Sequence, residues 1–328
     1  MTEMPAATTP RGLTEQPRGR TEQRHGRPGP GPGPGLARRG PARAFLRLVM
    51  IEHSVFALPF AYLAVLYASY QVSRSVHWNV LALVTLAMVA ARTFAMAANR
   101  IIDRGLDARN PRTAGRELAT GAMSVRTAAT GAAVSLLVFL GVAAALSPLC
   151  LALAPLALIP LVVYPYGKRF TWGCHGLLGL AQMVAPIGAW IAVTDAWSWS
   201  AVLLGAAVGL WIGGFDLIYA LQDIDSDRAT GVHSLPARFG APVALRVAKA
   251  AHVATVGMLI AFGAAVGAGP WWYAGLIVVT AAFAYEHHIV APDDLSRVNR
   301  AFFTMNGVVG IALFLFGVAD LISRGLMG

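Results

Sequence analysis

The sequence predicts an all-α fold, a polytopic bundle of nine helices that each cross a membrane. Of the 328 residues, 56% are hydrophobic and only 13% are charged, whereas about 25% are charged in a typical soluble domain. The mean hydropathy is +0.59. From Leu48 onward, apolar runs of about 20 residues, the length that a bilayer core requires, follow one another with short polar breaks.

The same composition argues against two other classes of protein. A soluble enzyme would carry more charge. A nucleic-acid-binding protein would explain the net charge of +10, but it would not explain the uncharged apolar runs. We therefore expect a lipid bilayer around this chain and no nucleic-acid partner, and nothing in the sequence implies a protein partner.

The first 44 residues form a basic, low-complexity segment. They hold eight arginines against three glutamates, and they include the run of alternating Gly and Pro at 29–35. Such a segment cannot bury apolar surface, and it lacks both the glycine period of collagen and the apolar stretch of a secretory signal. We expect a disordered cytoplasmic leader with no specific role; weak attraction to anionic lipid is the alternative.

The remainder, 45–328, is expected to form a single transmembrane domain. Prolines fall inside several of its apolar runs, and bundled membrane helices tolerate them because neighbouring helices and waters satisfy the freed carbonyl groups. The nine expected spans are 49–70, 78–99, 124–146, 149–166, 174–194, 200–221, 243–266, 271–291 and 299–323.

The distribution of Lys and Arg predicts the orientation of the bundle. The breaks after the second, fourth, sixth and eighth expected spans hold fourteen of these residues, whereas the opposite side holds only Arg74 and Arg324. Because cytoplasmic loops retain positive charge, we expect a cytoplasmic N-terminus and an external C-terminus in the bacterial inner membrane. Outer breaks hold four tryptophans, where an aromatic belt is expected: Trp197, Trp199, Trp271 and Trp272.

Acidic residues gather in and beside the two long cytoplasmic breaks, which follow the second and sixth spans. In the first cluster, spacings of four place Asn99, Asp103 and Asp107 on one stripe of the continuing second helix. The second cluster repeats this pattern with Tyr219, Asp223 and Asp227. Asp216, two turns before Asp223, is expected to join the second stripe from deeper in the membrane.

Carboxylates at this spacing repel one another unless a cation lies between them. Cys150 and Cys174 are expected near opposite faces of the bilayer, so no thiolate metal site is predicted. Oxygen ligands alone favour a hard cation, and Mg²⁺ typically binds through one or two carboxylates together with substrate phosphate. Two facing acidic stripes with magnesium between them would therefore receive a diphosphate.

Basic residues on the same face are candidates for holding that diphosphate. Arg109, Arg112 and Arg116 follow the first stripe, and Lys168 and Arg169 lie in the fourth break. The alternative is that these cations only set the topology, because the positive-inside bias requires no contact with a substrate.

The first stripe resembles a motif of the UbiA superfamily of membrane prenyltransferases, which join an allylic prenyl diphosphate to an aromatic or related acceptor. That family's first motif is an Asn-Asp-x-x-Asp-x-x-x-Asp run. Asn99, Asp103 and Asp107 match it, and Arg100 replaces its second residue. The first stripe is therefore expected to bind metal more weakly than in the family, or through Asn99 and water.

Other segments carry the resemblance from about Leu48 to the C-terminus. Asp223 and Asp227 match the family's second motif, and Tyr164–Lys168 looks like its Tyr-x-x-x-Lys motif. Three further phrases resemble the 4-hydroxybenzoate polyprenyltransferase-like branch, in particular its menaquinone-pathway members with a hydroxynaphthoate-type acceptor. They are Glu52–Pro59, Asn110–Glu117 and His233–Gly240.

The resemblance implies a bundle around a central cavity, with the two aspartate motifs facing each other at its cytoplasmic mouth. It implies that the chain transfers a polyprenyl group from a polyprenyl diphosphate to a hydroxybenzoate- or hydroxynaphthoate-type acid in ubiquinone or menaquinone biosynthesis. Mg²⁺ would assist ionisation, and Asp103, Asp107, Asp223 and Asp227 would be the catalytic and metal-binding residues. The ring proton would pass to a carboxylate of the second stripe or to released diphosphate.

Arg92 lies inside the second expected span, two turns before Asn99 on the same stripe. Intramembrane charge is functional by default, so we expect its guanidinium to hold the acid group of the acceptor. The alternative is a buried partner for Asp216 or a helix carbonyl. Asp216, Tyr219 and His53 are further candidates for the acceptor site, although His53 could instead mark the membrane interface.

Two other functional classes remain to be distinguished. A secondary transporter would also place acidic residues in a polytopic bundle, but at the midplane rather than beside basic loops at one face. A non-catalytic scaffold would not explain two pairs of aspartates at helical spacing. Glu286, followed by two histidines, is expected to be an interfacial residue rather than a metal ligand.

Overall fold

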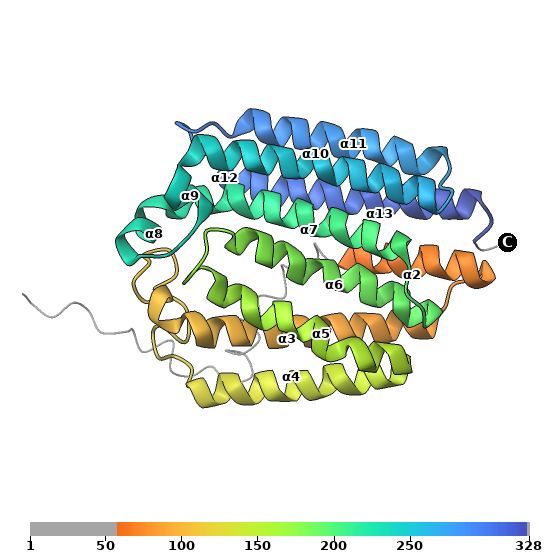
Figure 1. Cartoon of the computed structure of the whole chain (residues 1–328), viewed down its shortest axis with the longest axis horizontal. Coiled ribbons are helices and arrows are strands. Elements are labelled where there is room, and N and C mark those ends of the chain that lie inside the picture. The colour runs from red at the N-terminus through yellow and green to blue at the C-terminus, as the bar shows by residue number, and fades with distance from the viewer. Residues whose placement is uncertain (1–57, 327–328) are drawn as a thin grey trace, which may run out of the picture. The chain divides into compact units, whose positions relative to one another are not determined.

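The computed structural model describes residues 58–326, and within them all regular elements are helical, so the predicted all-α class is confirmed. The only β-type pairing in this range is one isolated bridge, between Ala291 and Asp294. The long helices are α2 (Leu58–Ser73), α3 (Trp78–Asp107), α4 (Val125–Leu146), α5 (Pro148–Gly167), α6 (Cys174–Thr194), α7 (Trp199–Tyr219), α10 (Ala241–Ala265), α11 (Pro270–Ile289) and α13 (Asn306–Ser323) (Figure 1). Short segments complete the chain: η2 (Ala220–Asp223), α8 (Ile224–Thr230), α9 (Leu235–Phe239), α12 (Val298–Arg300) and η3 (Ala301–Met305).

Seven helical segments in the described range are long and apolar enough to cross a membrane. They contain α3, α4, α5, α6, α7, α10 and α13. The first and eighth expected spans coincide with α2 and α11, which do not meet both criteria, so the count of nine spans stays a prediction. The leader, the start of the first expected span and His53 lie outside the described residues.

Local sequence signals account for the helix ends. Ser147 caps α5, because its hydroxyl accepts a hydrogen bond from the backbone N–H of Cys150, and Pro148 occupies the first helical position, where its missing N–H costs nothing. Helix α6 ends at Thr194, and the following residue, Asp195, adopts a left-handed conformation with φ 47°. Helix α3 continues beyond the expected span to Asp107, as the spacing of its acidic residues predicts.

Glycines allow α6 and α7 to cross in close contact, and α7 in turn packs against α10. A Cβ atom at Gly179 would lie 2.5 Å from the carbonyl oxygen of Gly209 on α7. Small residues at such crossings are typical of membrane helices, because van der Waals packing replaces the hydrophobic effect as the driving force. The contact fixes the start of α6 beside the end of α7, where the second acidic cluster follows.

Two expectations for polar and aromatic residues were wrong. Trp197, Trp199 and Trp271 are exposed, but Trp272 is not: it is 0% exposed, and its indole N–H donates to the carbonyl of Leu259. Glu286 is not interfacial, since it is also 0% exposed. Both residues lie on α11, whose inner face packs against α10 and α13. Sequence position near a helix end therefore did not reveal which side of the helix each residue occupies.

Candidate active site

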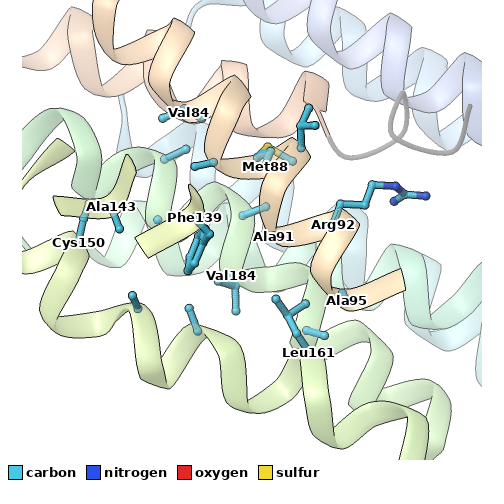
Figure 2. A pocket seen from close by; sticks show the side chains of 18 of the residues that line it. Val84, Met88, Ala91, Arg92, Ala95, Phe139, Ala143, Cys150, Leu161 and Val184 are labelled. Atoms are coloured by element: carbon cyan, nitrogen blue, oxygen red, sulfur yellow. The ribbon is translucent and has the colours of Figure 1, made fainter. Parts of the chain in front are cut away.

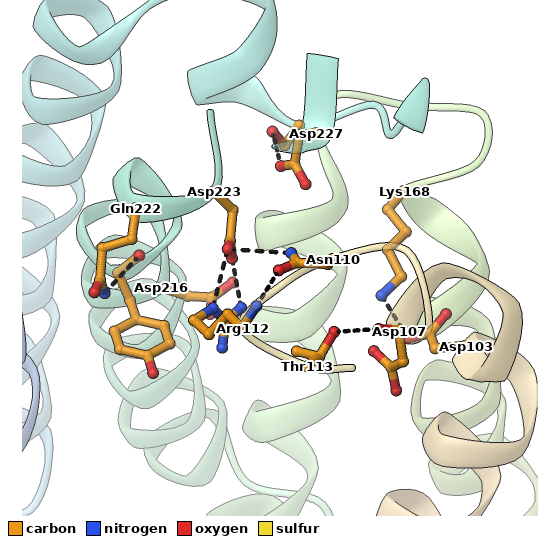
Figure 3. A network of polar contacts seen from close by, with 12 residues as sticks. Asp103, Asp107, Asn110, Arg112, Thr113, Lys168, Asp216, Gln222, Asp223 and Asp227 are labelled. Atoms are coloured by element: carbon orange, nitrogen blue, oxygen red, sulfur yellow. Dashed lines mark hydrogen bonds and ion pairs between the residues drawn. The ribbon is translucent and has the colours of Figure 1, made fainter. Parts of the chain in front are cut away.

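A polar cavity of about 310 Å³ lies at the end of the bundle where α3 and α5 finish and α6 begins. Both aspartate pairs line it: Asp103 and Asp107 from α3, Asp223 from η2 and Asp227 from α8 (Figure 3). Segments more than 100 residues apart in the sequence therefore place four carboxylates around one cavity.

The first aspartate pair is buried and engaged by cations. Asp103 is 1% exposed and Asp107 is 6% exposed. Lys168 Nζ lies 2.5 Å from Asp103 Oδ2, and Arg116 Nη1 lies 2.6 Å from Asp107 Oδ1. Arg169 Nη2 is 3.6 Å from Asp103 Oδ1 and also donates to the backbone carbonyl of Ile102. Three of the five basic residues expected to hold the diphosphate therefore contact the first pair.

The second aspartate pair does not lie on one continuous helix. Helix α7 ends at Tyr219, the chain tightens into the 3₁₀ segment η2, and α8 begins at Ile224. The expectation of an unbroken helical stripe is therefore wrong at 220–223. Asp216, Asp223 and Asp227 nevertheless all line the cavity, and Asp227 Oδ2 accepts a 2.7 Å hydrogen bond from Ser234 Oγ.

Arg112 connects the loop after α3 to the second aspartate pair. Its Nε and Nη2 donate to Asp223 Oδ1 and Oδ2 at 3.0 and 2.5 Å, a bidentate geometry that suits a carboxylate or a phosphate. Burial disfavours the Arg112 charge, but the hydrogen bonds and attraction from Asp223 outweigh it and raise the pKa of Arg112. The guanidinium also lies 5.3 Å from the ring centre of Tyr219. Asn110 Nδ2 donates to the same carboxylate at 3.3 Å.

The first motif and the Tyr-x-x-x-Lys segment are joined by a hydrogen bond. Asn99 Nδ2 donates to the hydroxyl of Tyr164, on α5, at 2.6 Å. Because the amide N–H of Asn99 makes this hydrogen bond, the amide oxygen of Asn99 is not used by Tyr164. Arg100, which replaces the second residue of the motif, is 5% exposed and lines the same cavity.

A second, apolar cavity of about 190 Å³ lies between α3, α4, α5 and α6 (Figure 2). Tyr164 lines both cavities, so they adjoin at this residue. Arg92 is the cation in the wall of the apolar cavity, and Figure 2 shows its side chain running away from Phe139 and Val184. Its Nε is buried without a hydrogen-bond partner among the described residues. Asp216 pairs with His175, and no ion pair between Arg92 and Asp216 is found among the described residues.

The donor set fits a hard divalent cation that is shared with a substrate. All the converging acidic ligands offer oxygen, which suits Mg²⁺. In the described part of the chain, however, no three acidic, histidine or cysteine side chains are arranged to hold a metal ion by themselves. An ion at this site would therefore need further ligands, which phosphate oxygens and water supply.

Most of the acidic and basic residues expected around the diphosphate line the polar cavity, but two basic residues do not. Arg109 is exposed and does not line the polar cavity. Arg169 does not line the cavity either, although it contacts Asp103. Three residues of the site were missed by the sequence analysis: His175, Ser234 and the side chain of Asn110. Asn110 and Ser234 lie in sequence segments that resemble the family, but no feature of the sequence pointed to His175.

The chain was compared with families and with proteins of known sequence. The model of the UbiA prenyltransferase family matches residues 57–308. A 4-hydroxybenzoate octaprenyltransferase of Alkalilimnicola ehrlichii is 33% identical over 243 residues, which cover 74% of this chain and 82% of that protein. The protein of the same name from Aromatoleum aromaticum is 31% identical, with 75% of this chain and 83% of that protein covered.

Solved structures have the same fold. A UbiA homolog from Aeropyrum pernix, in its apo form, superposes with a TM-score of 0.74 and 34% identity, covering 82% of this chain and 98% of that one. A UbiA homolog from Archaeoglobus fulgidus, bound to GPP and Mg²⁺, gives a TM-score of 0.62 and covers 85% and 99% of the two chains. At 19% identity, the second likeness concerns the fold alone.

Proposed function

Because this chain belongs to the UbiA prenyltransferase family, we propose that it transfers a polyprenyl group from an allylic polyprenyl diphosphate to an aromatic acid. The observation that carries this proposal is the convergence of two aspartate pairs, each engaged by an arginine or lysine, on one polar cavity beside an apolar one. Charged groups suit the diphosphate, and the apolar wall suits the prenyl chain.

The basic residues of the polar cavity are proposed to bind the diphosphate. Arg112, Arg116 and Lys168 each contact an aspartate of the cavity. When a diphosphate enters, their donors turn from carboxylate to phosphate oxygens, which attract them equally well. Held there, they stabilise the negative charge that grows on the leaving oxygen as the carbon–oxygen bond breaks.

Magnesium is proposed as the cofactor, held by Asp103, Asp107, Asp223 and Asp227 together with the amide oxygen of Asn99. When bound, it would neutralise the carboxylates and the departing diphosphate at the same time. The neutralisation explains why four acids can remain in a cavity that must also accept a polyanion.

The apolar cavity is proposed to hold the first units of the prenyl chain. Its wall consists largely of small and aliphatic side chains, among them Ala143, Leu161 and Val184 (Figure 2). An allylic cation reacts with water, so a dry wall favours transfer over hydrolysis. The rest of a long chain would extend into the surrounding lipid.

Arg92 is proposed to bind the acid group of the acceptor, with Tyr219 and His53 as further contributors to that site. The relatives named above act, by their names, on 4-hydroxybenzoate, which favours a hydroxybenzoate-type acceptor in the ubiquinone pathway. A hydroxynaphthoate-type acceptor in the menaquinone pathway is the other candidate, because the three sequence phrases resemble that branch. Both acids offer a carboxylate and a nearby electron-rich ring.

Product analysis tests the proposal. Membranes containing the protein are incubated with radiolabelled geranyl diphosphate, Mg²⁺ and either 4-hydroxybenzoate or 1,4-dihydroxy-2-naphthoate, and the products are identified by mass spectrometry. We expect a prenylated acid from one acceptor, and none from membranes with Asp103→Ala or Asp223→Ala protein at equal abundance. Movement of a cation across the membrane without any product would instead favour a transporter and contradict the proposal.

A further inference from the structure

His175 lies in the first turn of α6, in the wall of the polar cavity, and no step described above uses it. Its Nδ1 is 2.7 Å from Oδ2 of Asp216 on α7. The side chain is 8% exposed, and Nε2 is buried without a hydrogen-bond partner in the described range. A ring nitrogen left in this state costs free energy unless a ligand contacts it.

The pairing with Asp216 determines which nitrogen of the neutral ring is available. An ionised carboxylate only accepts hydrogen bonds, so it holds the proton of the imidazole on Nδ1. The lone pair then lies on Nε2, the nitrogen without a partner. When Nε2 takes up a proton, Asp216 stabilises the resulting imidazolium, and this arrangement is that of a general base with an orienting carboxylate.

The His–Asp pair lies deeper in the bundle than the second aspartate pair. It is therefore expected to lie nearer to the reacting carbon atoms than to the diphosphate. Asp216 precedes Asp223 by seven residues, three in the last turn of α7 and four in the 3₁₀ segment η2, a distance of about 12 Å along the helix axes. Tyr164, which adjoins the apolar cavity, lines the same polar cavity as His175. The His–Asp pair therefore lies on the side of the second aspartate pair that faces the membrane interior.

The other acidic side chains beside it already have partners. Asp223 makes a bidentate contact with the guanidinium of Arg112, and Asp227 accepts a hydrogen bond from Ser234. The thiol of the adjacent Cys174 points to the backbone carbonyl of His233. In the described range, His175 thus offers to this part of the cavity a buried ring nitrogen without a hydrogen-bond partner.

We propose that His175 is the general base of the prenyl transfer, an inference that rests on the function proposed above. As the bond between prenyl carbon C1 and the diphosphate oxygen breaks, C1 bonds to a ring carbon of the acceptor. That carbon then carries both the prenyl group and its hydrogen. Its C–H bond breaks, the proton passes to Nε2 of His175, and the electron pair returns to the ring, which is aromatic again. Released diphosphate or water removes the proton from His175 before the next turnover.

The test compares His175→Gln with the wild type in membranes, using geranyl diphosphate, Mg²⁺ and 4-hydroxybenzoate or 1,4-dihydroxy-2-naphthoate, whichever the wild type prenylates. The acceptor is used with hydrogen or with deuterium at the ring position that becomes prenylated. We expect prenyl transfer to fall roughly 10²- to 10⁴-fold, and a primary isotope effect to appear that the wild type does not show. Geraniol formation without acceptor, which needs only ionisation, should continue.

Two further variants complete the design. His233→Gln removes an exposed histidine nearby and should leave both reactions and the isotope effect unchanged. Asp216→Asn keeps the size of the side chain but no longer stabilises an imidazolium, so it should reduce transfer and expose the same isotope effect; it decides the matter if the His175 variant proves unfolded.

Several results would overturn the inference. Normal transfer by His175→Gln, or slow transfer without an isotope effect, would show that another group takes the proton. Equal loss of transfer and geraniol formation would assign His175 to diphosphate binding or to structure. If the wild type forms geraniol but prenylates neither acid, the proposed acceptor class and the inference are both contradicted. If the wild type catalyses neither reaction, the proposed function is contradicted.

Discussion

Arg112 illustrates how a single side chain can serve both the folded structure and the proposed substrate. Its guanidinium joins the loop after α3 to Asp223 in η2, across more than 100 residues of sequence (Figure 3). The same guanidinium can form a bidentate contact with a diphosphate. Arg109, three residues earlier, is exposed and does not line the polar cavity, so it carries the same charge without the contact.

Replacing Arg112 by Ala should therefore lower prenyl transfer by roughly 10²- to 10³-fold, the cost of losing one donor to developing charge. Arg112→Lys should recover only part of this loss, because an ammonium cannot form the two-pronged contact. Arg109→Ala is the matched control, and we expect it to retain transfer. Initial rates with radiolabelled geranyl diphosphate measure all three; equal losses at the two positions would reduce Arg112 to a contributor to topology.

Arg92 offers a prediction about the acceptor. Losing a charge-assisted hydrogen bond to its acid group should raise KM for that acid roughly 10- to 100-fold, so Arg92→Gln should be impaired with acids. An analogue without the carboxylate should lose little, since it makes no such contact in the wild type. Steady-state kinetics with the acid and the matching phenol or naphthol decide the matter. Equal losses for both acceptors would remove the anchoring role.

At the scale of helices, the crossing of α6 and α7 positions His175, Asp216 and the second aspartate pair. Gly179 has no room for a methyl group, because a Cβ would lie 2.5 Å from the carbonyl oxygen of Gly209, whereas a Cβ at Gly188, also on α6, would meet nothing within 4 Å. Overpacking of this kind typically costs about 1–3 kcal/mol.

Gly179→Ala should accordingly lower the midpoint of thermal unfolding in detergent, whereas Gly188→Ala should leave it unchanged or raise it slightly, as Gly→Ala substitutions at open helical positions do. Unfolding followed by loss of soluble, monodisperse protein would measure this. Equal stability of the two variants would mean that the crossing is looser than the structure shows.

The helices that carry the site were largely predictable, but the end of α7 was not. Long apolar runs and the i, i+4 spacing predicted α3 through Asp107. The break at η2 was missed, because Ala220, Leu221 and Gln222 do not signal the end of an α-helix. The burial of Glu286 and Trp272 was missed for a related reason: nearly every face of a membrane helix is apolar, so the sequence does not show which face is inside.

The four aspartates illustrate the same limit at the site. Their spacing predicted two clusters, and the structure shows both around one cavity. The His175–Asp216 pair could not be predicted, because a lone histidine and an aspartate 41 residues away share no local pattern. Only the packing of α6 on α7 makes them neighbours.

At the scale of the whole molecule, the distribution of Arg and Lys predicts that the polar cavity opens to the cytoplasm. Single-cysteine variants test this in a background without Cys150 and Cys174. A membrane-impermeant maleimide should label Ser75→Cys in intact cells, and it should label Ala229→Cys only after lysis; both positions are exposed. The reverse pattern would place the site on the outer face.

The central claim is that the two aspartate pairs bind one prenyl diphosphate through divalent ions. It is tested by calorimetric titration of the purified protein with geranyl thiolodiphosphate, a substrate analogue whose carbon–sulfur bond breaks slowly. We predict tight binding with Mg²⁺, weak binding in EDTA, and weak binding by both Asp103→Asn and Asp223→Asn with Mg²⁺ present. Unchanged affinity in EDTA, or in either variant, would contradict the claim.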